Sequence, residues 1–345
     1  MGYIRFFLAI CVIFAHAGPL PVFGYMAGGL VAVLCFFILS GFYMALVLDQ
    51  KYQTVAPFYW NRFSRIFSGY WVALVFALIV MYLCHDNLFQ RIFSSNLTMD
   101  AKAFLVASNV LIFGTDFSLF LDATQNGLSF VSSAPGGGTS AHQYLALPQS
   151  WSLPVELMFY IMAPFCCRSP VRLIILFVAS YASLLWLTGL FGNVDPWAAR
   201  VFPVTVMYFV SGALCYRLLP LAKRSNRAWG FLAMAVVLFG ITTLDILPTD
   251  LRWLIFPAIA IATPFIICTI SGRIEQMLGE VSYMVYLSHI PVLYALQYLG
   301  HASMPLVVVL SICVSFVLLP IVKALDNAIR SRFPRRNRQY ERVEI

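Results

Sequence analysis

Charged side chains are scarce in this chain, since Asp, Glu, Lys and Arg together make up only 10% of its 345 residues. A soluble domain has about 25%. Hydrophobic residues reach 61%, which leaves too few polar side chains to cover the surface of a soluble domain. The same composition excludes a disordered chain, a collagen and a coiled coil. It predicts an all-α polytopic membrane protein with little mass outside the bilayer.

Several other patterns are missing from the sequence. The eight cysteines form no C-x-x-C pair and show no metal-ligand spacing with histidine, and all but Cys84 lie in apolar runs, where a cysteine acts as a small hydrophobic residue. We therefore expect no disulfide framework and no metal site. There is no internal repeat and no separate soluble domain, and we expect no nucleic-acid partner.

Long apolar runs are what the sequence does contain. A membrane-spanning helix needs about 20 mainly apolar residues, and ten segments, some of them short, are candidates. They lie at 4–23, 28–48, 66–84, 153–167, 171–190, 201–218, 228–246, 251–270, 281–299 and 305–326. An eleventh segment at 103–113 is short and contains Ser108 and Asn109.

The basic residues decide how the eleventh segment is interpreted, because cytoplasmic loops are enriched in Lys and Arg. With ten spans and the amino terminus inside, 18 of the 22 basic residues lie on the inner side. If 103–113 also spanned the membrane, only 6 would lie inside and 16 outside. The sequence thus predicts ten transmembrane helices and a short re-entrant or interfacial segment at 103–113. Both termini are then cytoplasmic.

This topology divides the chain into a membrane domain at 1–329 and a basic cytoplasmic tail at 330–345. The tail serves as a topogenic signal or contacts anionic lipid. The longest connection, 85–152, lies outside, and its Gly-rich part at 132–140 predicts a flexible loop.

Ionisable residues inside membrane-spanning helices are expensive and usually functional. Arg5 and His16 lie eleven positions apart in the first apolar segment, which is three helical turns plus about 20°, so they share one helix face at an axial separation of about 16 Å. Arg5 then lies near the cytoplasmic end and His16 in the outer half. The structural alternatives are a topological anchor for Arg5 and a helix–helix hydrogen bond for His16.

A second basic pair, Arg62 and Arg65, lies where the third segment starts. Their i, i+3 spacing places them on one face of a helix, and two guanidinium groups so arranged can bind phosphate in a fork. The alternative is contact with lipid headgroups.

The most informative acid is Glu156, about one turn into the fourth segment. It is expected at a depth similar to that of His16, and a carboxylate beside an imidazole orients the ring and raises its basicity. Glu156 is therefore the second candidate catalytic residue, which either orients His16 or holds a substrate. The alternative is a structural pair with another residue.

Four further residues are candidates for lining a cavity. Ser40 precedes Gly41 in the second segment, where small residues also allow close helix packing. Tyr160 follows Glu156, and Tyr283 and His289 lie at the ninth segment. His289 is equally compatible with a buried structural role.

These residues occur in blocks whose order is similar to that of a known family. The blocks are Arg5-x10-His16, Phe36-Phe-Ile-Leu-Ser-Gly-Phe42, Arg62-Phe-Ser-Arg65, Trp151-Ser-Leu-Pro-Val-Glu-x3-Tyr160 and Leu278-Gly-Glu-Val-Ser-Tyr-Met-Val-Tyr-Leu-Ser-His-Ile-Pro291. Over about residues 1–326 the chain resembles the membrane acyltransferase-3 family, the bacterial O-acyltransferases that modify cell-surface glycans.

The resemblance implies transfer of an acyl group, usually acetyl from acetyl-CoA, across the bacterial inner membrane to a sugar hydroxyl. It implies that His16 is the catalytic histidine, Arg5 its motif partner, and Arg62 and Arg65 the donor-binding pair. The expected partners are acyl-CoA, a glycan or lipid-linked glycan acceptor such as O-antigen or exopolysaccharide, and membrane lipids. A covalent acyl-histidine relay is an open alternative to general-base catalysis.

A different class of function is also compatible with ten helices and intramembrane charges. A secondary transporter, or a flippase for lipid or glycan, would act without acyl transfer. The lack of repeats, and arginines at one end with His16 and Glu156 towards the other, argue against this class.

Overall fold

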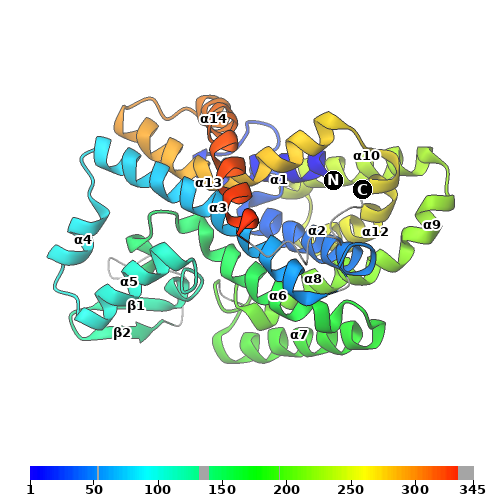
Figure 1. The fold of residues 1–345 in the computed structure, drawn as a ribbon, viewed down its shortest axis with the longest axis horizontal. Helices are drawn as coiled ribbons and strands as arrows, with labels where there is room; N and C mark the ends of the chain where they lie inside the picture. Colours follow the sequence, from blue (N-terminus) through cyan, green and yellow to red (C-terminus); the bar gives the residue numbers. More distant parts are fainter. Residues whose placement is uncertain (53, 132–139, 194, 333–345) are drawn as a thin grey trace.

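The computed structural model describes residues 1–345 except 53, 132–139, 194 and 333–345. The described part is a bundle of helices with a thin layer of short elements at one end (Figure 1). The Gly-rich segment predicted to be flexible and most of the predicted basic tail lie outside the described residues.

Every predicted apolar segment corresponds to a helix of the bundle. The helices are α1 (Gly2–Ala17), α2 (Gly28–Gln50), α3 (Val55–Leu83), α6 (Ser152–Cys166), α7 (Pro170–Phe191), α8 (Phe202–Cys215), α10 (Arg227–Thr243), α12 (Ile255–Thr269), α13 (Arg273–Tyr298) and α14 (Met304–Ser331). Short helices α9 (Leu219–Arg224) and α11 (Thr249–Arg252) extend two of the spans.

Seven helical spans in the described part are long and apolar enough to cross a membrane by themselves. The exceptions are α1 and α6, which are shorter, and α13, which is long but more polar. The chain is thus a multi-pass, mainly helical membrane protein. The count of ten spans stays a prediction.

Several predicted boundaries are wrong, most of all in the first, third and ninth segments. The ninth was expected to start at residue 281, but α13 begins at Arg273. The first segment was expected to reach residue 23, but α1 ends at Ala17 because Gly18 adopts a φ of 121° and Pro19 follows. The third was expected to start at residue 66, but α3 begins at Val55. As a result His16 lies in the last turn of α1, and Arg62 and Arg65 lie well inside α3 rather than at its start.

The layer at one end of the bundle comes from the longest connection. It contains α4 (Leu88–Ser94), α5 (Met99–Leu111) and a hairpin of β1 (Leu121–Thr124) and β2 (Gly127–Phe130), in which Leu121 pairs with Phe130. The sequence did not predict this hairpin. The amino terminus lies at the opposite end of the bundle (Figure 1).

The eleventh candidate segment corresponds to α5. Its 13 residues span about 20 Å, too short for the roughly 30 Å hydrocarbon core. Tyr70 and Trp71 of α3 donate hydrogen bonds to the carbonyl groups of Asn109 and Val110 at its end. The end of α5 is thus held against the middle of α3, and the helix is too short to cross the hydrocarbon core by itself. That it does not span stays a prediction.

Close helix contacts hold the pocket-forming helices together. A Cβ atom on Gly41 of α2 would lie 1.8 Å from the carbonyl oxygen of Phe209 of α8, and one on Gly212 of α8 would lie 1.8 Å from that of Ile38. Only glycine allows this approach, as small residues do in membrane helix packing generally. In the other half, α1 packs along α13 and α13 packs along α3.

Candidate functional site

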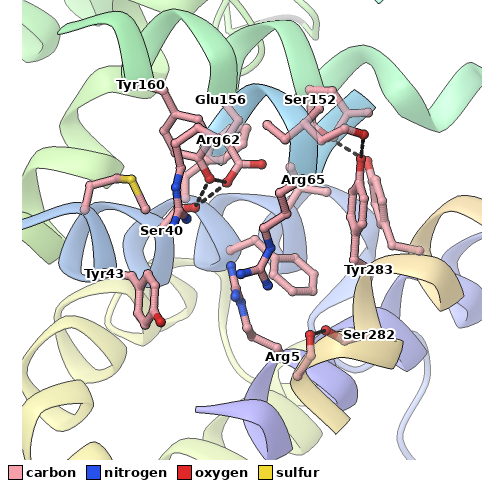
Figure 2. Close-up of a pocket in the computed structure, with 18 residues that line it drawn as sticks. Arg5, Ser40, Tyr43, Arg62, Arg65, Ser152, Glu156, Tyr160, Ser282 and Tyr283 are labelled. Carbon is pink, nitrogen blue, oxygen red and sulfur yellow. Dashed lines mark hydrogen bonds between the residues drawn. The ribbon is translucent and has the colours of Figure 1, made fainter. Parts of the chain in front are cut away.

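A cavity with an empty volume of about 810 Å³, open solvent included, lies inside the bundle between α1, α2, α3, α6 and α13 (Figure 2). The structure brings together here most of the residues that the sequence singled out. They are Arg5, Ser40, Arg62, Arg65, Glu156, Tyr160 and Tyr283. We call this space the central cavity.

Positive charge dominates the central cavity. Its three arginines are partly buried, and among the described residues no carboxylate lies within 4.0 Å of a guanidinium nitrogen of Arg5, Arg62 or Arg65. The guanidinium carbon of Arg62 lies 6.0 Å from the ring centres of Tyr43 and Tyr160, within the cation–π range.

The Nε atom of Arg62 is buried without a hydrogen-bond partner in the described part of the chain. A buried donor or charge left unpaired is costly. An anionic ligand would therefore complete the central cavity.

Among the residues that the structure describes, Glu156 is the one acid that lines the central cavity. Its carboxylate accepts hydrogen bonds from the hydroxyl groups of Ser40 and Tyr160, and Figure 2 shows these bonds. No hydrogen bond joins Glu156 to His16 in the described residues, so the contact that would orient the imidazole is not present. The carboxylate of Glu156 instead points to Ser40 on α2 and to Tyr160, which lies one turn further along α6.

His16 lies in a second space of about 740 Å³, which we call the histidine pocket. His16 is exposed within it, at the end of α1. Val33 and Tyr286 line both the histidine pocket and the central cavity. The two spaces are therefore neighbours, and α1 places Arg5 at one and His16 at the other.

The histidine pocket contains polar residues that sequence reasoning did not select as site residues: His142, Gln149 and Arg200. Arg200 donates two hydrogen bonds of 2.6 Å to Asp195, and its guanidinium carbon lies 4.7 Å from the Trp151 ring centre. His142 and Gln149 come from the connection between α5 and α6, and Arg200 comes from the one between α7 and α8, so no local spacing marks the three together in the sequence.

Burial affects the chemistry of two of these residues, His142 and Gln149. Burial, followed by the charge of Arg200 and by His16, lowers the pKa of His142 to about 4, so this ring is neutral at pH 7. The Oε1 atom of Gln149 is buried without a hydrogen-bond partner in the described part, while its amide nitrogen donates to the carbonyl of Leu287. Oε1 is thus free to accept a hydrogen bond from a ligand.

His289 was expected to line a cavity, but it lines neither the central cavity nor the histidine pocket. Its side chain is fully buried, and its ring lies beside His16 with the centroids 5.3 Å apart. Nδ1 lies 2.8 Å from the carbonyl oxygen of Tyr286, and because a carbonyl only accepts, Nδ1 carries the proton. Nε2 is then an acceptor, and it has no partner among the described residues.

A third space of about 1100 Å³, the terminal pocket, lies beside Met1 and Glu275. It shares Arg5, Tyr43 and Arg65 with the central cavity. The terminal pocket, the central cavity and the histidine pocket thus follow one another along α1. In the described residues no group of three His, Cys, Asp or Glu side chains is placed to hold a metal ion.

Fold and site together define a multi-pass membrane protein with a cationic cavity in its bundle and an exposed histidine beyond it. A family model described as an acyltransferase domain, that of the acyltransferase-3 family, matches residues 1–325. The chain therefore belongs to the acyltransferase-3 family, which confirms the resemblance and supports a role in acyl transfer. No curated protein and no solved structure shows a significant match to it.

Proposed function

We propose that the protein transfers an acyl group, acetyl in the simplest case, from cytoplasmic acyl-CoA to a hydroxyl of a cell-surface glycan. The observation that carries the proposal is the order of the three spaces along α1, which runs from an arginine-lined cavity to a pocket with an exposed histidine. The positive-inside distribution of basic residues supports an inner-membrane protein with the terminal pocket on the cytoplasmic side.

The donor end follows from charge. Coenzyme A carries several phosphate groups, and Arg5, Arg62 and Arg65 supply guanidinium groups without carboxylate partners in the described part. Planar guanidinium groups bind phosphate through paired hydrogen bonds. The thin pantetheine arm would then extend through the central cavity towards Tyr286, past the hydroxyls that Glu156 holds in place.

The acceptor end follows from the histidine pocket. The guanidinium group of Arg200, which lies over the buried Trp151 ring, offers a flat surface in the pocket of His16, and Oε1 of Gln149 lacks a partner in the described part. A sugar ring can pack on such a surface. One of its hydroxyl groups can donate a hydrogen bond to Oε1 of Gln149 while another is presented to His16. Glu156 does not line this pocket, and the role proposed for it differs from the two expected ones: it positions the hydroxyl groups of Ser40 and Tyr160 in the central cavity.

The chemistry is a single acyl transfer. Neutral His16 takes the proton of the acceptor hydroxyl while its oxygen attacks the thioester carbonyl carbon. The carbon–sulfur bond then breaks, and the proton passes from His16 to the thiolate, so coenzyme A leaves as the thiol. General-base assistance of this kind contributes typically 10²–10⁴ in rate.

Radiolabel transfer tests this proposal. Purified protein in vesicles is given [¹⁴C]acetyl-CoA on one side and glycan extract on the other, and labelled ester in the glycan is measured. We expect transfer by the native protein and none by His16→Ala, with donor binding retained by the variant. Movement of glycan across the membrane without labelled ester would support the transporter class instead.

A further inference from the structure

A groove with an empty volume of about 2170 Å³ lies on another side of the bundle, between α7, α8 and α12. Its floor contains buried side chains such as Leu34 and Ala260, both 2% exposed, and its rim contains Leu185 and Ile261, both more than half exposed. Figure 1 shows α7 along one edge of the molecule, next to α8. The groove faces the region where lipid chains surround the protein.

The groove changes from apolar to polar along its length. It follows α7 from Phe177 to Thr188, a rise of about 16 Å, which is about half of the roughly 30 Å hydrocarbon core. At the end beyond Thr188 it is lined by Asn193 and Asp195. These dimensions and this polarity match one lipid of a single leaflet, with its chain along α7 and its head at Asp195.

The polar end of the groove adjoins the histidine pocket. Leu30 of α2 lines both spaces. Asp195 lines the groove, Arg200 lines the pocket, and their side chains are joined by two hydrogen bonds of 2.6 Å. A head group at the end of the groove therefore lies next to the pocket that holds His16.

From this continuity we infer that the groove binds the hydrocarbon chain of the acyl acceptor, and that the acceptor is a glycolipid. Its sugar enters the histidine pocket past Leu30 and the Asp195–Arg200 pair. The inference rests on the proposed function and names its acceptor class. An ordinary phospholipid fits the apolar part, but the opening of the polar end onto His16 favours a lipid whose head carries the reacting hydroxyl.

Anchoring the acceptor in this way has a clear physical benefit. A chain held in the groove restricts the sugar to the neighbourhood of His16, which raises its effective concentration there. Lateral entry from the bilayer also brings the acceptor to the catalytic histidine without a route through the donor-filled central cavity.

The test fills the groove without touching the histidine pocket. Thr188→Trp places a large side chain on the groove wall, and Leu190→Trp places the same side chain on an α7 residue that does not line the groove. Both variants and the native protein are reconstituted with a lipid extract and a water-soluble glycan extract of the source cells, and are given [¹⁴C]acetyl-CoA. After the donor is removed, ester-bound label is measured in the organic phase and in the aqueous phase.

We expect label in lipid-extractable glycan, reduced about tenfold or more by Thr188→Trp because several buried methylene groups lose their site. Leu190→Trp should transfer at the native rate, and both should bind coenzyme A normally and elute as folded protein. If Thr188→Trp misfolds, Ala198→Trp at the polar end of the groove replaces it.

Equal transfer by the groove variants and the control would overturn the inference, as would label confined to water-soluble glycan. In both cases His16-dependent transfer persists and the proposed function stands. No label in either phase from the native protein would instead reject the proposed function itself.

Discussion

At the scale of single residues, the arginines of the central cavity make the sharpest prediction. Charge-assisted hydrogen bonds contribute roughly 1.5–3 kcal/mol each, so Arg62→Ala or Arg65→Ala should weaken coenzyme A binding about ten- to a hundredfold. Lysine at either position should restore the affinity only in part, because its ammonium group lacks the planar fork of a guanidinium group. Isothermal titration of the purified protein with coenzyme A measures the change.

The matched control for this experiment is Arg172→Ala, since Arg172 is exposed on α7 and donates to the carbonyl of Phe165, away from the central cavity. Its donor affinity should stay native. Normal affinity in both cavity variants would mean that Arg62 and Arg65 act only as topological anchors.

His289 is expected to act through His16, as a positioning residue. Its Nε2 atom is an acceptor without a partner in the described part, beside the His16 ring, so it can fix the tautomer and orientation of His16. His289→Leu should lower kcat and leave the KM for the donor unchanged. His289→Gln, whose amide oxygen can accept a hydrogen bond near the position of Nε2, should restore part of kcat. A purely structural role predicts less folded protein with native turnover per molecule in both variants.

At the scale of helices, the contact between α2 and α8 depends on two glycines. A Cβ at Gly212 would lie 1.8 Å from the carbonyl oxygen of Ile38, whereas one at Gly189 on α7 would meet nothing within 4 Å. Gly212→Ala should therefore push α8 away from α2 and reduce both the yield of folded protein and its thermal midpoint. Gly189→Ala should leave both unchanged. Size-exclusion profiles and thermal unfolding compare the two, and equal behaviour would contradict the tight contact.

The short helical turn that carries His142 (Ala141–Tyr144) makes the stability of the protein depend on pH. The pKa of His142 is about 4 in the folded protein, against an ordinary value of 6.5, and Arg200 and His16 are the charged and titratable groups that lower it beyond burial. Between these values the unfolded chain binds more protons than the folded one. Stability contributed by neutral His142 is thus complete above pH 6.5 and is lost as the pH falls towards 4.

His142→Gln removes this titration. Thermal midpoints measured from pH 7.5 to 4.5 should fall less steeply for the variant than for the native protein. Parallel curves for the two proteins would show that His142 does not titrate differently on unfolding.

At the scale of the whole molecule, the prediction concerns topology. A reporter fused after Ile345 should be cytoplasmic, and one inserted at Asn126, in the exposed turn of the β1–β2 hairpin, should be external. If α5 crossed the membrane, both reporters would change sides, with Asn126 cytoplasmic and the carboxyl terminus external. Both reporters on one side would contradict the seven spans predicted between Asn126 and Ile345. Activity assays with paired phosphatase and fluorescent reporters distinguish these outcomes.

The sequence by itself determined the class of protein and the positions of the helices. Apolar runs must be removed from water whatever their neighbours, so composition and hydropathy located every main helix. The boundaries were less predictable: α1 ends early at Gly18, and α3 begins three turns before its apolar run. Periodicity also placed Arg5 with His16, and Arg62 with Arg65, because residues on one helix face need no tertiary information.

Only the tertiary structure decided which of these faces meet. Glu156 bonds to Ser40, 116 residues away in the chain, and not to His16. His289 lies beside His16, while His142 and Arg200 complete the histidine pocket from separate connections. Such contacts depend on how α2, α6 and α13 pack around α1. That packing is set by shape, as at Gly41 and Gly212, and leaves no periodic signal in the sequence.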